Sequence, residues 1–175
     1  MFKFSKDEDG TATVEFVIIF TVFFGFLFSI IDAGWHMVRI VQLERATDLV
    51  SRDLRLGFYE DTSYDNILKE ICDKTGVVSK CQELVVLQSE TIDMNTNINS
   101  TPPVCFDPFA SEEELEEFDP SEGFAIGARS DLVIIRACAK VRPILATASI
   151  LSLFIEFDDR GYVNIETKTG ILNEP

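Results

Sequence analysis

A glycine and a glutamate precede a long apolar segment at a defined spacing. Gly10 closes the acidic stretch 7–10, Glu15 follows five residues later, and the sixteen residues from Phe16 to Ile31 carry no charge. A carboxylate at the rim of a bilayer loses part of its hydration, which costs free energy. Snorkelling of Glu15 toward the lipid headgroups explains why it is tolerated there, but it does not explain the glycine upstream. The spacing therefore makes Gly10 and Glu15 candidate functional residues.

The four cysteines are the second set of reactive side chains. None belongs to a C-x-x-C pair, and the single histidine, His36, lies far from all of them in the sequence. A zinc site would need four thiolates at irregular spacing, so we expect no metal. In an oxidising compartment the simpler interpretation is two disulfides. Of the three possible connectivities we favour Cys72–Cys81 and Cys105–Cys138, with four buried free thiols as the alternative.

Composition and motifs argue against several classes of function. Thirty Asp and Glu residues against fifteen Lys and Arg give a net charge of −15, which leaves no basic surface for nucleic acid. The chain contains no G-x-S-x-G, P-loop or H-E-x-x-H motif and no second histidine. We therefore expect neither an enzyme active site nor a cofactor.

An acidic run at residues 111–122, SEEELEEFDPSE, holds seven carboxylates. Clustered carboxylates suit a calcium ion, but the ligand spacing of an EF-hand is absent. A solvated helical face or a flexible loop is the favoured interpretation.

The apolar segment predicts a single membrane-spanning helix at about residues 14–33. It has no polar face, and a chain of 175 residues is too small to surround such a helix with protein. Its sixteen uncharged residues alone extend over about 24 Å as a helix. A cleaved secretory signal is less consistent with Trp35 and the helical pattern that follows. The flanking charges do not decide the orientation, but the cysteines favour a cytoplasmic N-terminus and an oxidising compartment for the C-terminal part.

The helix is expected to continue well beyond the membrane. No proline or glycine interrupts residues 35–56, and one stripe of apolar or small residues recurs at helical spacing: Ile40, Leu43, Thr47, Val50 and Leu54. Trp35 suits an anchor at the membrane surface. His36 lies beside it, either as a pH switch or, in the interpretation we favour, as an ordinary interfacial residue. We predict one helix from about Thr11 to a stop at Gly57.

The remaining sequence predicts a small α+β domain. A second helix is expected at residues 61–76, capped by Thr62 or Ser63 and ended by Gly76. Strands are expected at residues 83–92, 131–141 and 162–168, the second of them ended by Pro143. Residues 93–103 are predicted to form a loop, and residues 145–157 a short helix or turn running into an edge strand. The fold class is therefore α+β, with a long N-terminal helix packed on a small antiparallel sheet.

The N-terminal residues resemble a known processing signal. Gly10, Thr-Ala-Thr-Val, Glu15-Phe16 and the apolar span look like the cleavage site of type IV prepilin-like proteins. The closest resemblance is to the TadE-like minor pseudopilins of the tight-adherence (Tad) pilus system. The acid-x-Gly motif that often closes the span appears as Asp32-Ala33-Gly34, and the ending Asn-Glu-Pro at 173–175 also resembles this family. One departure is Asp9, where family leaders usually carry arginine.

The resemblance implies a function in pilus assembly and a pilin-like fold. Residues 1–10 would be a cytoplasmic leader, residues 11–57 the long helix, and residues 58–175 a soluble periplasmic domain. A prepilin peptidase would cut between Gly10 and Thr11, and Glu15 would then pair with the freed Thr11 amine of a neighbouring subunit. The expected partners are that peptidase, other Tad pseudopilins, the inner-membrane platform of the pilus and the lipid bilayer. The alternative is a signal-anchored periplasmic enzyme or ligand-binding domain unrelated to pili.

Overall fold

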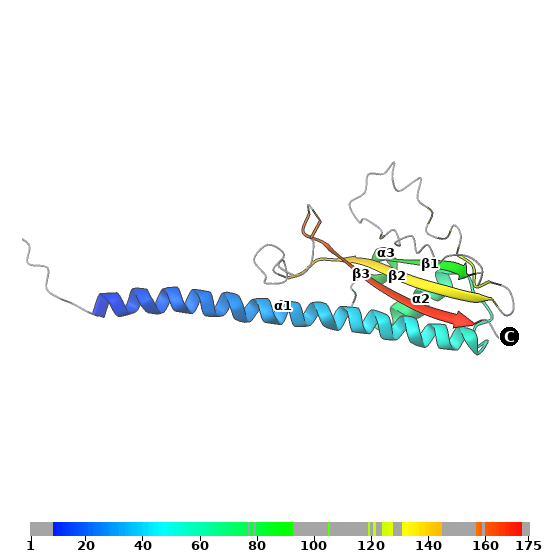
Figure 1. Cartoon of the computed structure of the whole chain (residues 1–175), viewed down its shortest axis with the longest axis horizontal. Coiled ribbons are helices and arrows are strands. Elements are labelled where there is room, and N and C mark those ends of the chain that lie inside the picture. Colours follow the sequence, from blue (N-terminus) through cyan, green and yellow to red (C-terminus); the bar gives the residue numbers. More distant parts are fainter. Residues whose placement is uncertain are drawn as a thin grey trace, which may run out of the picture.

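One continuous helix forms the long axis of the molecule. The computed structural model describes residues 9–76, 78, 80–92, 105, 119, 121, 124–127, 131–144, 157–158 and 160–172. Helix α1 covers Asp9–Arg55, beginning two residues before the expected start at Thr11. It ends just before Gly57, which has a φ of 69° that residues with a side chain rarely adopt. Its first half extends away from the rest of the protein, and its second half lies along the sheet (Figure 1).

Three strands form an antiparallel sheet in the order β1-β2-β3. Strand β1 covers Val85–Ile92, β2 covers Leu132–Val141 and β3 covers Val163–Leu172. The register pairs Leu132 of the central strand with Ile92 on one side and with Leu172 on the other. The second strand ends at Val141, two residues before Pro143, as the missing proline N–H requires. The third strand begins one residue later than predicted and extends four residues further, to Leu172.

Two helices complete the domain. Helix α2 covers Tyr64–Thr75 and ends at Gly76, which adopts the left-handed conformation expected of a helix stop. Ser63 is the N-cap residue, but its side chain makes no capping hydrogen bond. A short helix, α3 at Cys81–Leu84, was not predicted. The expectation that the first strand begins at Glu83 is therefore wrong, because Glu83 and Leu84 belong to α3.

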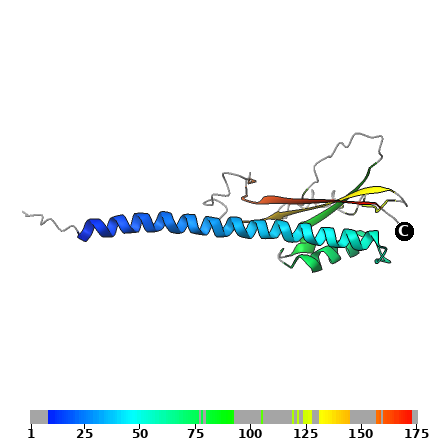
Figure 2. The same ribbon diagram turned by 60° about the horizontal axis from the view of Figure 1, so that its bottom comes forward.

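The core lies between one face of the sheet and the two longer helices, which cover that face together (Figure 2). The predicted stripe on α1 supplies Leu43, Val50 and Leu54 to this core. Alternate residues of β2, from Val133 to Val141, are buried against the helices, as the two-residue period of a strand predicts. The burial of these apolar side chains is what fixes the second half of α1 to the domain.

Several predictions concern residues outside those that the structure describes. They are the loop at 93–103, residues 145–156, the C-terminal residues 173–175, the first eight residues of the leader, and the acidic run except Asp119 and Ser121.

Candidate functional site

The predicted processing residues all lie at the start of α1. Gly10 and Thr11 are in its first turn, and Glu15 and Phe16 follow one turn later. Thr11 and Glu15 are four residues apart, so they lie along the same side of the helix, about 6 Å apart along its axis. The expected cleavage site and the Glu15 carboxylate therefore both lie on α1.

The surroundings of Glu15 are apolar and open. Glu15 is exposed, and no hydrogen bond or ion pair reaches its carboxylate from the residues that the structure describes. The neighbouring Phe16 is 64% exposed, and Val17 and Ile18 are similarly exposed. In water such a surface would be costly, so these side chains need a bilayer or other apolar partners. A carboxylate in that setting gains from any nearby positive charge.

Aromatic side chains line one side of the same half of α1. The rings of Phe16 and Phe20 lie 5.5 Å apart between centroids, those of Phe20 and Phe24 4.3 Å, and those of Phe24 and Phe28 6.0 Å. This spacing of four residues places the rings over one another along the helix. Within the described residues, α1 is the one helix long and apolar enough to cross a membrane.

Two hydroxyl groups in this half of α1 form hydrogen bonds within the helix. The hydroxyl of Thr21 donates to the carbonyl of Val17 at 2.8 Å, and that of Ser29 donates to the carbonyl of Gly25 at 2.9 Å. Such bonds to the preceding turn are how hydroxyl side chains are accommodated in hydrocarbon. The helix is therefore compatible with a lipid environment despite these two residues.

A polar connection marks the end of the predicted span. Asp32 is 2% exposed, and its carboxylate accepts a hydrogen bond from the backbone N–H of Ile144 at 2.8 Å. About two turns further on, Arg39 donates to the carbonyl of Arg142 at 3.0 Å. These two bonds attach the chain after β2 to α1 just beyond the apolar half of the helix. Sequence reasoning missed this role of Asp32, although a lone acid at the end of an apolar segment was a usable signal.

His36 is buried between these two contacts. It is 2% exposed, and its Nδ1 atom has no hydrogen-bond partner among the described residues. Burial, followed by the positive charge of Arg39, lowers the pKa of His36, while the carboxylate of Asp32 acts in the opposite direction. The histidine is thus a neutral, buried residue near neutral pH, rather than one exposed at a surface.

The cysteines form the two pairs that the sequence analysis favours. Cys72 of α2 is joined to Cys81 at the start of α3, with Cα atoms 5.5 Å apart. Cys105 is joined to Cys138 of β2, with Cα atoms 5.2 Å apart. Cys138 alternates with the residues that face the helices, so this second bond lies on the opposite face of the sheet.

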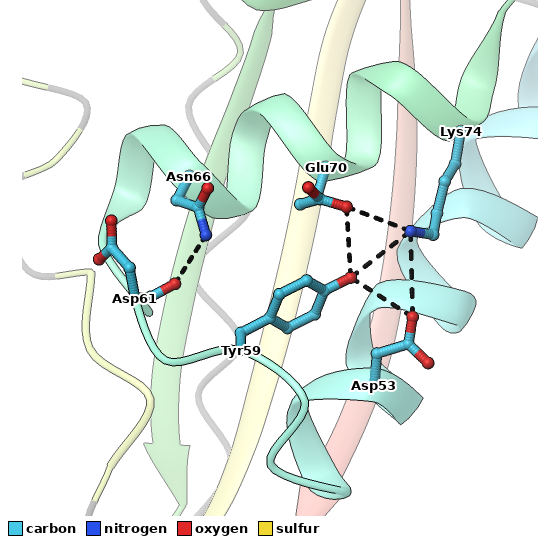
Figure 3. A network of polar contacts seen from close by, with 6 residues as sticks. All are labelled: Asp53, Tyr59, Asp61, Asn66, Glu70 and Lys74. Carbon is cyan, nitrogen blue, oxygen red and sulfur yellow. Dashed lines mark hydrogen bonds and ion pairs between the residues drawn. The ribbon is translucent and has the colours of Figure 1, made fainter.

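A polar network holds the junction between α1 and α2 (Figure 3). The hydroxyl of Tyr59 donates to Asp53 at 3.3 Å, and the ammonium of Lys74 lies 3.3 Å from Glu70 and 3.9 Å from Asp53. Partial burial raises the pKa of Tyr59, although the hydrogen bond from Lys74 opposes this. The network fixes the turn after α1, and nothing about it suggests catalysis. Among the described residues, no group of three or more His, Cys, Asp or Glu could hold a metal ion.

Comparison with protein-family models finds a match to the TadE-like proteins over residues 10–52. Over this segment, about a quarter of its length, the chain is similar to the TadE-like family. The match begins at Gly10, the expected cleavage residue, and it covers both the apolar half of α1 and most of the half that packs on the sheet. Comparisons with curated proteins and with solved structures give no match. The matched segment therefore lies within α1, and the sheet domain lies outside the match.

Proposed function

We propose that this protein is a minor pseudopilin of a Tad pilus that helps to initiate or support pilus assembly at the bacterial inner membrane. The observation that carries the proposal is the TadE-like match on a helix with two distinct halves. The first half exposes apolar side chains, and the second half is buried on a sheet domain. A subunit of this form can be held by a membrane and still present a folded domain to partners.

The proposed topology is a single pass with a cytoplasmic N-terminus and a periplasmic domain. Two disulfides in the domain support this orientation, because such bonds persist in oxidising compartments. The role is structural and non-enzymatic. Its partners are other Tad pseudopilins and the inner-membrane platform of the pilus, and it contributes to the adhesion of cells through the pilus.

A prepilin peptidase removes residues 1–10 in this proposal. Cleavage between Gly10 and Thr11 requires an extended backbone in the peptidase, whereas both residues lie in the first turn of α1. The first turn of a helix frays readily, and glycine reduces the cost of leaving the helical conformation. The freed amine of Thr11 then lies near the membrane rim, where the Glu15 carboxylate of a neighbouring subunit pairs with it.

The mass of the protein recovered from membranes tests the proposal directly. We expect the intact mass of the extracted full chain to lack Met1–Gly10 in cells that contain the peptidase, and to retain them when the peptidase gene is deleted. Retention of the ten residues in both strains would favour the signal-anchored alternative over a pseudopilin.

A further inference from the structure

The end of the sheet that faces the apolar half of α1 carries a cluster of cationic side chains. A cavity of about 210 Å³ there is lined by Arg39 of α1, Lys140 and Arg142 at the end of β2, and Tyr162 before β3, together with Val78, Leu84 and Val141. Among the described residues no acidic side chain lines it, although Asp158 lies 3.5 Å from Lys140 beside it. In a chain with a net charge of −15, three positive charges around one cavity are a local reversal of sign.

The position of this cavity relative to the bilayer follows from α1. Arg39 lies six residues beyond Ala33, the end of the predicted span, which is about 9 Å along the helix axis. Lipid headgroups occupy roughly the first 5–8 Å outside the hydrocarbon core. The hydrogen bond from Ile144 to Asp32 holds the chain after β2 down at the end of the span. Arg39 therefore lies at the outer edge of the headgroup layer, and the bond to Asp32 brings the Arg142 side of the cavity closer to the hydrocarbon, so that the cavity borders the headgroups.

Exposed apolar side chains flank the cavity on the membrane side. Ile144 is 68% exposed, and Trp35 is 41% exposed with the guanidinium of Arg39 located 5.9 Å from its ring centroid. An indole and an aliphatic side chain beside arginine are typical of the boundary between hydrocarbon and headgroups.

The cationic groups retain capacity for a ligand. Arg39 has five N–H donors, and one of its nitrogens bonds the carbonyl of Arg142. The side chain of Arg142 is exposed. Lys140 lies 3.5 Å from Asp158, so its charge is partly balanced. Two guanidinium groups next to an ammonium group are suited to the oxygens of a phosphate.

From this arrangement we infer that the cavity between Arg39, Lys140, Arg142 and Tyr162 binds the phosphate headgroup of an anionic phospholipid. The inference rests on the membrane anchoring in the proposed function. It adds a specific lipid contact by which the domain is held down on the bilayer surface. The ligand is the lipid rather than free phosphate, because the cavity borders the headgroups and lies beside two membrane-facing apolar side chains.

Trp35 provides the test, since it is the single tryptophan of the chain. The full chain is placed in nanodiscs of phosphatidylcholine that contain an equal minor fraction of either brominated phosphatidylglycerol or brominated phosphatidylcholine. Bromine quenches a nearby indole, so enrichment of one lipid beside Trp35 appears as stronger quenching. We expect the anionic lipid to quench Trp35 more strongly than the neutral one.

The variant Arg142→Gln removes one charge and leaves the backbone carbonyl that accepts from Arg39. A single positive charge near an anionic surface strengthens binding about fivefold, so the preference for the anionic lipid should fall by about that factor in Arg142→Gln. It should fall further in the double variant Arg39→Gln/Arg142→Gln. Arg52→Gln is the matched control, because Arg52 is exposed on the far part of α1. Its lipid preference should equal that of the wild type. Added inorganic phosphate should not change the wild-type preference.

Equal quenching by the two lipids, or the same preference in all variants, overturns the lipid site while leaving the anchor intact. Loss of the preference on adding inorganic phosphate assigns the cavity to the free ion and also overturns it. Absence of quenching by either lipid contradicts the membrane anchor, and with it both the proposed function and this site.

Discussion

Glu15 and Gly10 differ in what they require from their surroundings. Glu15 is a charge placed among exposed apolar side chains. The free-energy cost of that placement is relieved by a positively charged partner, which the isolated chain does not supply. Gly10 is a point of backbone freedom at the start of a helix. In the proposed function the first therefore acts in assembly and the second in maturation, and substitutions can separate the two steps.

The substitution Gly10→Leu should block maturation. A branched side chain next to the scissile bond clashes in a groove that accepts glycine, and leucine also favours the helical conformation that must be lost. Intact mass should show the retained leader. Gly25→Leu is the control, because Gly25 lies in the same half of α1 with open space around its Cα atom. An unchanged mature mass for Gly10→Leu would end the cleavage proposal.

The substitution Glu15→Gln should leave insertion and cleavage intact but reduce association with other pseudopilins. It leaves the Thr11 amine of a neighbour near the membrane without its counter-charge, and losing one member of a poorly hydrated pair is more damaging than losing both. Detergent-resistant co-purification of partner subunits measures the effect, which should exceed tenfold. Glu44→Gln, at an exposed position in the half of α1 that packs on the sheet, should behave as wild type. Equal recovery of partners by Glu15→Gln would show that the pairing role is wrong.

At the scale of elements, the predictable features were those that follow from local periodicity. The spacing of apolar residues predicts the buried stripe on α1 and the alternation in β2, and both are confirmed. Each follows from the local repeat of side-chain directions in a helix or a strand. Helix α3 was missed, since four residues carry no periodic signal and its first residue is held by the bond to Cys72. The link from Asp32 to Ile144 joins residues 112 positions apart, and no local pattern encodes such a contact. For the same reason, the cationic cavity was not foreseen.

Tyr64 connects α2 to the outer strand of the sheet. It is largely buried, its ring meets that of Phe124 edge-on at 5.5 Å, and its hydroxyl accepts the backbone N–H of Leu87 at 3.4 Å. Strand β1 is at the edge of the described sheet and pairs only with β2. The bond to Tyr64 therefore gives the backbone N–H of Leu87 a partner. Burial raises the pKa of Tyr64, and the bond from Leu87 opposes this rise.

Tyr64→Phe should therefore change both the stability and its dependence on pH. Loss of the Tyr64 hydroxyl, which accepts the N–H of Leu87, should lower the free energy of unfolding by about 1–3 kcal/mol near neutral pH. In the wild type the raised pKa gives stability that is fully present below about pH 10 and is lost as the pH rises through the folded value. Urea unfolding of the full chain in detergent, near neutral pH and at alkaline pH, should show a smaller alkaline loss for the variant. Tyr162→Phe is the control and should lose as much stability at alkaline pH as the wild type. An equal alkaline loss of stability in Tyr64→Phe and wild type would contradict the role given to Tyr64.

The bond between Cys105 and Cys138 should contribute more to stability than that between Cys72 and Cys81. It closes a loop of 33 residues rather than 9. On the chain-entropy model the two bonds contribute about 4 and about 3 kcal/mol respectively. Cys105→Ser should lower the free energy of unfolding of the oxidised full chain by that larger amount, and Cys72→Ser by the smaller. Equal unfolding midpoints for wild type and Cys105→Ser would contradict the role of the longer loop.

At the scale of the whole molecule, membrane anchor and folded domain share one uninterrupted element. α1 has 47 residues, which corresponds to about 70 Å of helix. The domain is attached along its second half by the core and at Asp32 by the bond from Ile144. No linker therefore separates the span from the sheet.

This continuity has a mechanical consequence. A flexible tether would absorb a pull on the domain, whereas a stiff rod fastened at two levels transmits axial displacement and rotation without slack. When a partner subunit draws the sheet outward by one helical turn, the span must rise by the same distance, about 5.4 Å, and Glu15 rises with it. In the proposed topology the depth of the carboxylate in the bilayer and the height of the domain above it therefore change together, so force applied in the periplasm is transmitted to the opposite face of the membrane.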